Sequence, residues 1–196
     1  MASSSNPTTL VPSQQRDYGQ PVQHEETSCG LLLFRKRTTT PPPNNNNNNP
    51  NNNNSYEFLL MKHSHRLDLP KGRMEPGESY LQTASREFSE ETSLPVNTTT
   101  LSIHPRFEFV EYYSYYSHRK KCRVGKTLRM YLAFAKEHVD LLNVKPTEHG
   151  GFQWMEFDES KKMCIQKNTI DPLLRAIQKY LKDHSCGLKE LHEESL

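Results

Sequence analysis

Two low-complexity stretches decide how much of this 196-residue chain can contribute to a folded core. Residues 1–24 are rich in Ser, Thr, Pro and Gln and contain few apolar side chains, which is typical of a disordered tail. Residues 37–55 combine a run of prolines with tracts of asparagine, which predicts a loop that cannot build a core. We therefore expect one domain over residues 25–184, interrupted by this loop, and a C-terminal tail over residues 185–196.

The overall composition excludes several classes of protein. Apolar residues make up 33% of the chain, but its polarity is concentrated in the low-complexity stretches, so the remainder can bury a core of moderate size. A net charge of +2 argues against a protein that coats nucleic acid. No signal peptide or membrane span is recognisable, and no Cys-x-x-Cys pair occurs among the cysteines, which favours free thiols. We expect a cytoplasmic monomer without a membrane partner, and a nuclear pool stays open.

The order of apolar segments predicts an α/β (α+β) fold with a mixed central sheet between helices. Short runs rich in aliphatic and aromatic residues predict strands, which fall at residues 28–36, 56–62, 101–110, 112–116, 127–135 and 151–156. The first two strands flank the Asn-rich loop, which is therefore an insertion between them. Near the C-terminus, Asp171-Pro172 has the pattern of a helix N-cap followed by proline.

A central amphipathic helix is predicted after a loop that is rich in Pro and Gly. Ser79 and Gln82 have the spacing of a capping box at its start. Leu81, Ala84 and Phe88 recur at positions i, i+3 and i+7, which places them on one helix face. We expect this apolar face to fix the helix to the sheet.

Three glutamates of the same helix lie off that apolar face. At about 100° per residue, Glu87, Glu90 and Glu91 fall within an arc of about 100°. Each like-charge pair at i,i+3 or i,i+4 costs roughly a few tenths of a kcal/mol. A lone pattern of this kind is compatible with a solvated acidic face. It is also compatible with a magnesium site, because hard carboxylate oxygens on a rigid helix suit that cation.

The residues before and after these acids decide between the two interpretations. Their pattern is Gly72-x5-Glu78-x7-Arg86-Glu87-Phe88-x-Glu90-Glu91-x-Ser93-Leu94. This pattern resembles the Nudix box and differs from it at one position, Ser93, where the family has glycine. Glycine there would serve a left-handed turn after the helix, which serine adopts at a cost of about 1 kcal/mol or replaces by another turn. The difference removes no metal ligand.

The resemblance implies a Nudix α/β/α sandwich and magnesium-dependent hydrolysis of a pyrophosphate bond, with Mn²⁺ as a substitute cation. It implies a set of metal ligands, which are Glu87, Glu90, Glu91 and the backbone carbonyl of Gly72. Arg86 would hold and orient a carboxylate through a bidentate pair. Glu78 would close the preceding loop onto the helix.

Three further segments resemble the asymmetrical diadenosine tetraphosphate hydrolase branch of the family. They are Cys29 to Arg35, the loop Leu69 to Glu78 with its P-K-G and E-P-G-E sequences, and Lys126-Thr127 with Thr147-Glu148-His149, Phe152 and Trp154. Lys71 and Lys126 would hold phosphates. Glu148 would be a metal ligand or a general base, or else an ordinary surface residue. Phe152 would stack on a purine or belong to the core, and Trp154 fits the core better.

The expected activity is hydrolysis of a dinucleoside polyphosphate, with diadenosine tetraphosphate converted to ATP and AMP. A basic stretch over residues 119–129 keeps two other substrates open, a diphosphoinositol polyphosphate and the capped or triphosphorylated 5′ end of RNA. Apart from such an RNA end, no nucleic-acid partner is expected. A non-catalytic nucleotide-binding module is the third alternative, although the complete set of glutamates argues against it.

Overall fold

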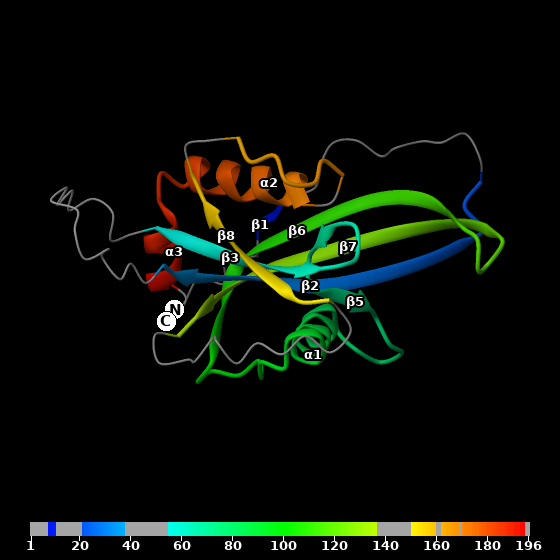
Figure 1. Ribbon diagram of the computed structural model, residues 1–196, viewed down its shortest axis with the longest axis horizontal. Helices are drawn as coiled ribbons and strands as arrows, with labels where there is room; N and C mark the ends of the chain where they lie inside the picture. The colour runs from blue at the N-terminus through cyan, green and yellow to red at the C-terminus, as the bar shows by residue number, and fades with distance from the viewer. Residues whose placement is uncertain are drawn as a thin grey trace, which may run out of the picture.

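The described residues form an eight-stranded mixed sheet between helices (Figure 1). The computed structural model describes residues 8–10 (backbone only), 21–37, 55–136, 150–159, 162–168 and 170–194. Its elements in chain order are β1 (Thr8–Leu10), β2 (His24–Lys36), β3 (Tyr56–Lys62), β4 (Leu67–Asp68), β5 (Lys71–Arg73), α1 (Tyr80–Thr92), β6 (Leu101–Ser117), β7 (Cys122–Ala135), β8 (Phe152–Phe157), α2 (Ile170–Asp183) and α3 (Leu188–Glu194).

The sheet contains parallel and antiparallel pairs, which confirms the expected mixed sheet. Its strand order is β1-β6-β7-β2-β3-β4, with β5 paired to β2 and β8 paired to β3. Strands β2 and β7 are parallel, as are β1 and β6, and the other pairs are antiparallel. The two strands predicted over residues 101–116 are one continuous strand, because the ladder with β7 runs through Glu111 without a break.

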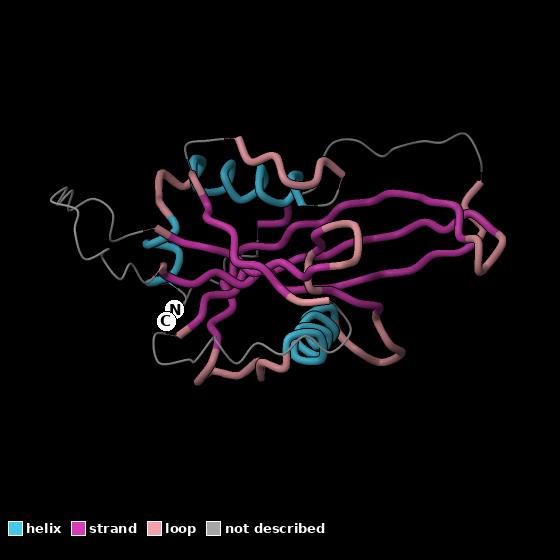
Figure 2. Tube along the Cα trace, in the orientation of Figure 1, coloured by secondary structure: helices cyan, strands magenta, loops and turns pink. Residues whose placement is uncertain are grey.

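Helices cover both faces of the sheet, which explains why the central strand β2 is apolar from Leu31 to Phe34. Figure 2 shows α1 and α2 on opposite sides of the strands. Successive side chains of a strand point to opposite faces. On β2, Leu32 and Phe34 face the cluster that contains α2, whereas Leu31 and Leu33 face the cluster that contains α1. A strand buried on both faces has no polar alternation.

The hairpin of β6 and β7, together with the start of β2, extends beyond the helices (Figure 1). In this extension Tyr113 of β6 lies opposite Lys126 of β7, and Glu26 of β2 lies opposite Lys126 on its other side. The register therefore brings polar residues of three strands side by side, at a part of the sheet that α2 leaves uncovered.

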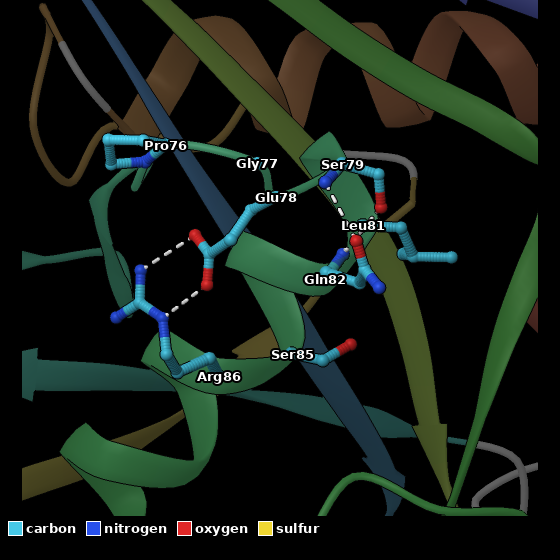
Figure 3. Close-up of a pocket in the computed structure, with 8 residues that line it drawn as sticks. All are labelled: Pro76, Gly77, Glu78, Ser79, Leu81, Gln82, Ser85 and Arg86. Carbon is cyan, nitrogen blue, oxygen red and sulfur yellow. Dashed lines mark hydrogen bonds and ion pairs between the residues drawn. The ribbon is translucent and has the colours of Figure 1, made fainter.

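Helix α1 begins as predicted, but its buried face differs from the predicted one. The capping box is present, with Gln82 N donating to Ser79 Oγ at 3.3 Å and Ser79 N donating to Gln82 Oε1 at 2.8 Å. Ala84 and Phe88 are fully buried, as expected. Leu81 is 43% exposed, so its predicted place on the sheet is wrong. It lies in the first turn of the helix, where it lines an open pocket (Figure 3).

Some described residues near the two chain ends form strands and a helix that were not predicted. Residues 188–194, predicted as part of a tail, form α3, and the prediction fails because Leu188 and Leu191 complete the core cluster beneath α2. Within residues 1–24, Thr8–Leu10 form β1 against β6, and β2 already begins at His24. Helix α2 begins at Ile170, so Asp171 is not its N-cap. Its carboxylate instead accepts hydrogen bonds from the backbone before the helix.

The Asn-rich loop joins two adjacent antiparallel strands, as expected. Its residues 38–54 lie outside the described residues, but Arg37 N donates to Ser55 O at 2.9 Å on either side of them. All four cysteines are free thiols. In the described ranges, no helix combines the length and the apolar character that a bilayer crossing requires.

Ser93 adopts the left-handed turn that glycine has in the Nudix box. Its φ of 61° and ψ of 13° lie in the left-handed region, and its N–H donates to Ser89 O at 2.9 Å to close α1. We predict that Ser93→Gly is more stable than Ser93→Ala by about 1 kcal/mol, since both variants lose the hydroxyl and only alanine has a Cβ that disfavours this conformation. Chemical denaturation of the two variants measures the difference, and equal stabilities would contradict it.

Candidate active site

The glycine that opens the motif makes room for a carboxylate. Gly72 lies on β5, paired with Cys29 of β2, and α1 crosses above it. A Cβ at Gly72 would lie 1.9 Å from Cδ and Oε2 of Glu87. Any larger residue therefore competes with Glu87 for the same space. This close approach holds a helix carboxylate against the backbone whose carbonyl the family resemblance makes a ligand.

Arg86 joins the acids of the motif. It donates five hydrogen bonds within the described part of the chain. Nε and Nη2 form a bidentate pair with Glu78, at 2.6 and 3.0 Å (Figure 3). Nη1 contacts Glu87 Oε1 at 2.9 Å and Glu90 Oε2 at 3.1 Å. Nη2 also donates to the carbonyl of Arg73 at 3.0 Å. The guanidinium thus closes the loop onto α1 through Glu78 and orients two helix carboxylates.

Glu78 is held in its ionised form. The guanidinium of Arg86, the N–H of Glu75 and the hydroxyl of Thr83 all donate to its carboxylate and lower its pKa to about 2. In return, the carboxylate raises the pKa of Arg86. Thr83 is fully buried and was not singled out from the sequence. Its position five residues after Glu78, on the inner face of the helix, is the sequence signal that could have identified Thr83 as a hydrogen-bond donor to Glu78.

The three helix glutamates have different surroundings. Glu91 is buried, and its Oε2 accepts from the N–H of Lys71 at 3.3 Å. The side chain of Glu87 is 15% exposed and that of Glu90 is 55% exposed. Within the described ranges, no group of three His, Cys, Asp or Glu side chains is arranged to hold a metal ion. The donors are nevertheless hard oxygens at one edge of a rigid helix, which fits magnesium in kind.

Lys71 is held by a carboxylate that the sequence argument missed. Its Nζ lies 2.9 Å from Oδ1 of Asp68. Burial raises the pKa of Asp68. The charge and hydrogen bond of Lys71, together with hydrogen bonds from Leu69 N and Arg66, lower this pKa by more, so the net shift is downward. The i,i+3 spacing of Asp68 and Lys71 in L-D-L-P-K-G was the available signal. The pair fixes one ammonium group beside the motif.

Lys126, the second lysine that the resemblance singles out, experiences the positive charge of Lys71. Burial lowers the pKa of Lys126, and the positive charges of Lys71 and Arg73 lower it further, whereas Glu26 opposes the shift. The ammonium Nζ lies 3.7 Å from Oε1 of Glu26. Two lysines from distant parts of the sequence therefore gather on the face of the sheet that α2 leaves uncovered.

Neither Phe152 nor Trp154 lies with Lys71 and Lys126. Phe152 is partly buried and packs with Trp154 against the cluster beneath α1, and Arg35 lies 3.9 Å from the ring centroid of Trp154. Strand alternation places Lys126 on the opposite face, with Leu128 and Met130. Phe152 and Lys126 therefore face different sides of the sheet. Glu148 lies outside the described residues.

Comparisons with known proteins agree with the motif. The model of the NUDIX domain matches residues 48–174. The asymmetrical bis(5′-nucleosyl)-tetraphosphatase of Sus scrofa is 33% identical over 144 residues, which cover 72% of this chain and 86% of that protein. The Rattus norvegicus protein of the same name is 30% identical and covers 70% and 83%. A solved C. elegans Ap4A hydrolase binary complex is 25% identical, with a TM-score of 0.57, and covers 81% of this chain and 98% of that one.

Gly72→Ala should displace the carboxylate of Glu87 without breaking the strand. The added Cβ meets the far end of that side chain, which can move. We expect catalytic rate or metal affinity to fall about 10- to 100-fold, as for other residues that orient metal ligands. Hydrolysis assays and isothermal titration with Mn²⁺ check this. Gly77→Ala is the matched comparison, because a Cβ there meets nothing within 4 Å and its φ of 89° strains alanine instead. Gly77→Ala should lower the melting temperature and leave the hydrolysis rate nearly unchanged. Undiminished activity of Gly72→Ala would contradict the assignment.

Glu78→Gln should remove a stabilisation that depends on pH. The pKa of Glu78 is lowered from 4.5 to about 2 on folding, so its ionised form stabilises the fold above about pH 4.5, and this contribution disappears as the pH falls towards 2. The melting temperature of Glu78→Gln should therefore lie furthest below wild type near neutral pH and approach it in acid. Glu75→Gln, at an exposed position of the same loop, should differ less from wild type at neutral pH. A gap for Glu78→Gln that stays constant with pH would refute this role.

Proposed function

Because this chain belongs to the Nudix family of hydrolases, we propose that it is a magnesium-dependent enzyme that converts diadenosine tetraphosphate to ATP and AMP. The observation that carries the proposal is the close packing of the Glu87 carboxylate on Gly72 of β5, where Arg86 donates a hydrogen bond to it. The names of the two mammalian relatives and of the C. elegans hydrolase support the choice of substrate.

Magnesium would be held by oxygens at the edge of α1. The proposed ligands are Glu87, Glu90, Glu91 and the backbone carbonyl of Gly72. Bound there, magnesium supplies charge neutralisation of the diphosphate and an activated water for attack on phosphorus. Mn²⁺ has similar ligand preferences and is expected to substitute.

Arg86 is proposed to keep the metal ligands in place before any cation arrives. Glu87 and Glu90 are like charges on neighbouring turns, and both contact Nη1 of Arg86, which offsets their repulsion. Glu78 occupies the rest of the guanidinium fork, so Arg86 has little freedom to leave. A preorganised ligand set reduces the cost of binding the metal and the substrate.

Lys71 and Lys126 are proposed to bind phosphates of the substrate. Asp68 fixes Lys71, and the ladder between β2 and β7 fixes the backbone of Lys126. Burial costs Lys126 solvation, and its contact with Glu26 is long at 3.7 Å. A phosphate oxygen would compensate that cost better than the present contact does.

Two further assignments remain part of the proposal. Glu148 is proposed as an additional metal ligand or as the general base, on the likeness of its segment to the tetraphosphatase branch. Phe152 is proposed to stack on a purine through the part of its ring that the core leaves exposed.

The exposed turn between β6 and β7 supports a second substrate class. Arg119, Lys120 and Lys121 are all exposed there. A cluster of cations beside a diphosphate site would attract the 5′ end of capped or triphosphorylated RNA, whose backbone adds negative charge.

One experiment separates these substrates. The purified protein is incubated with magnesium and, in separate reactions, dinucleoside polyphosphates, diphosphoinositol polyphosphates and capped or triphosphorylated RNA, and the products are followed by chromatography. Conversion of diadenosine tetraphosphate to ATP and AMP at the highest kcat/KM is expected. Turnover of diphosphoinositols or RNA alone would refute the nucleotide assignment.

Glu91→Gln should reduce the rate at least about 100-fold, because it replaces an ionised metal ligand by a neutral amide. The amide oxygen can still accept from the N–H of Lys71, so the helix should keep its position. Hydrolysis assays at saturating magnesium measure the rate, and the melting temperature reports folding. Glu193→Gln on α3, far along the chain from the motif, is the charge-matched control. Wild-type activity of Glu91→Gln would mean that the acidic face has another purpose.

A further inference from the structure

A largely buried ion pair lies on the face of the sheet that α1 covers. Arg129 Nη1 of β7 donates to Glu108 Oε1 of β6 at 2.6 Å, and the two side chains are 19% and 11% exposed. The hydroxyl of Tyr131 donates to the same oxygen at 2.9 Å. Tyr131 also packs against the apolar cluster that contains Ala84 and Phe88 of α1. Arg129 therefore differs from the exposed cations of the basic stretch, because it serves the interior.

The ring of Tyr80 joins this ion pair to α1. Tyr80 is the first residue of the helix, and Cζ of Arg129 lies 4.0 Å from the centroid of its ring. A guanidinium at this distance is attracted by the face of an aromatic ring. Leu81, the next side chain of the same turn, is 43% exposed. The contact between Tyr80 and Arg129 therefore joins the first turn of α1 to β7.

The ion pair fixes the direction of the guanidinium more than it stabilises the fold. Desolvation of two buried charges offsets most of their attraction, so apolar side chains of similar volume would stabilise this part of the core equally well. Within the described residues, Nε of Arg129 has no hydrogen-bond acceptor. Glu108, itself held by Tyr131, instead determines where the guanidinium lies beneath the ring.

One strand separates the ion pair from the motif. Arg129 of β7 lies opposite Cys29 of β2, and on its other side Cys29 lies opposite Gly72 of β5. The pKa of the Cys29 thiol reflects both neighbours. Burial raises this pKa to about 12, the positive charge of Arg129 opposes the shift, and the negative charge of Glu87 adds to it. The ion pair and the motif carboxylates thus lie under the same helix, within electrostatic reach of one side chain.

We propose that the Arg129–Glu108 pair positions the first turn of α1 through the ring of Tyr80. The contact thereby sets the places of Glu78, two residues before Tyr80, and of Glu87, two turns further along the helix. A shift of the first turn would move both carboxylates relative to β5. The inference rests on the proposed function, because it assigns these carboxylates to the metal site. Arg129 and Tyr80 are positioning residues, which act through the helix.

Removal of the ring tests the contact with a variant that retains an apolar side chain. Tyr80→Leu loses the attraction for Arg129, whereas Tyr80→Phe retains a ring and is the matched control. In isothermal titration with Mn²⁺ and no substrate, Tyr80→Leu should bind about tenfold more weakly than wild type, as for other residues that orient metal ligands. Tyr80→Phe should stay within about twofold, because a phenyl ring also attracts a guanidinium. Arg129→Met, which removes the charge at similar length, should behave like Tyr80→Leu.

Alkylation of Cys29 tests the same contact without metal or turnover. Its thiol is fully buried in the cluster that α1 covers, so iodoacetamide reaches it when the helix opens from the sheet. Modification of each cysteine in metal-free protein is followed by peptide mass spectrometry. Cys29 should react at least about fivefold faster in Tyr80→Leu and at the wild-type rate in Tyr80→Phe. Cys122, which is partly exposed at the start of β7, is the internal control and should react equally in all variants.

Turnover separates positioning from a general loss of folded protein. With diadenosine tetraphosphate, the magnesium concentration for half-maximal rate should rise about tenfold in Tyr80→Leu, while the KM for the nucleotide stays within about threefold of wild type. Partial unfolding would lower kcat and change neither constant. Equal Mn²⁺ affinity and equal Cys29 alkylation in Tyr80→Leu and Tyr80→Phe would overturn the proposal, as would wild-type values in Arg129→Met.

The positioning role and the proposed function can fail separately. Absence of turnover by the wild-type protein, together with the expected Mn²⁺ and alkylation results, would refute the proposed substrate and leave the positioning role intact. Normal turnover with unchanged Mn²⁺ affinity and unchanged alkylation in Tyr80→Leu would refute the positioning role and leave the activity intact. If Arg129→Met does not fold, Tyr80→Leu decides alone, because Tyr80 is 41% exposed and its replacement leaves the buried charges paired.

Discussion

The bidentate pair between Arg86 and Glu78 is the interaction on which the arrangement of this site depends. It joins the loop after β5 to the second turn of α1, and the same guanidinium reaches Glu87, Glu90 and the carbonyl of Arg73. Without the guanidinium, the carboxylates of Glu78, Glu87 and Glu90 would repel one another. Because Arg86 presents its donors in a rigid fork, it fixes directions as well as charge, which lysine would not do.

The sheet has an apolar part beneath the helices and a polar part beside the residues around Arg86. Its central strands are apolar on both faces where α1 and α2 cover them, and become polar where β2, β6 and β7 run past the helices (Figure 1). Lys126 and Glu26 lie in that polar extension, on one register line. The same strands thus contribute to the core at one end and present charged groups, Lys126 among them, at the other.

Local rules predicted the elements well and their burial less well. Capping of α1 at Ser79 and the left-handed turn at Ser93 follow from short-range backbone geometry. The capping box was predicted, and the left-handed turn was one of two alternatives for Ser93. Leu81 belongs to the apolar stripe by spacing, yet it is exposed, because periodicity cannot tell which turn of a helix lies over the sheet. Residues 188–194 looked like a tail because two leucines form no long pattern, although the core had space for both.

The sequence by itself determined the family, the longer strands and helices in their order, and the acids of the motif. Spacing along one helix is sufficient to put Glu87, Glu90 and Glu91 on one side. Only the tertiary structure decided which partners these groups have. The contacts of Glu26 with Arg73, Lys120 and Lys126 join segments that pair in the sheet or meet at its edge. A charged residue on a strand is indistinguishable from a surface residue until the register places another strand beside it.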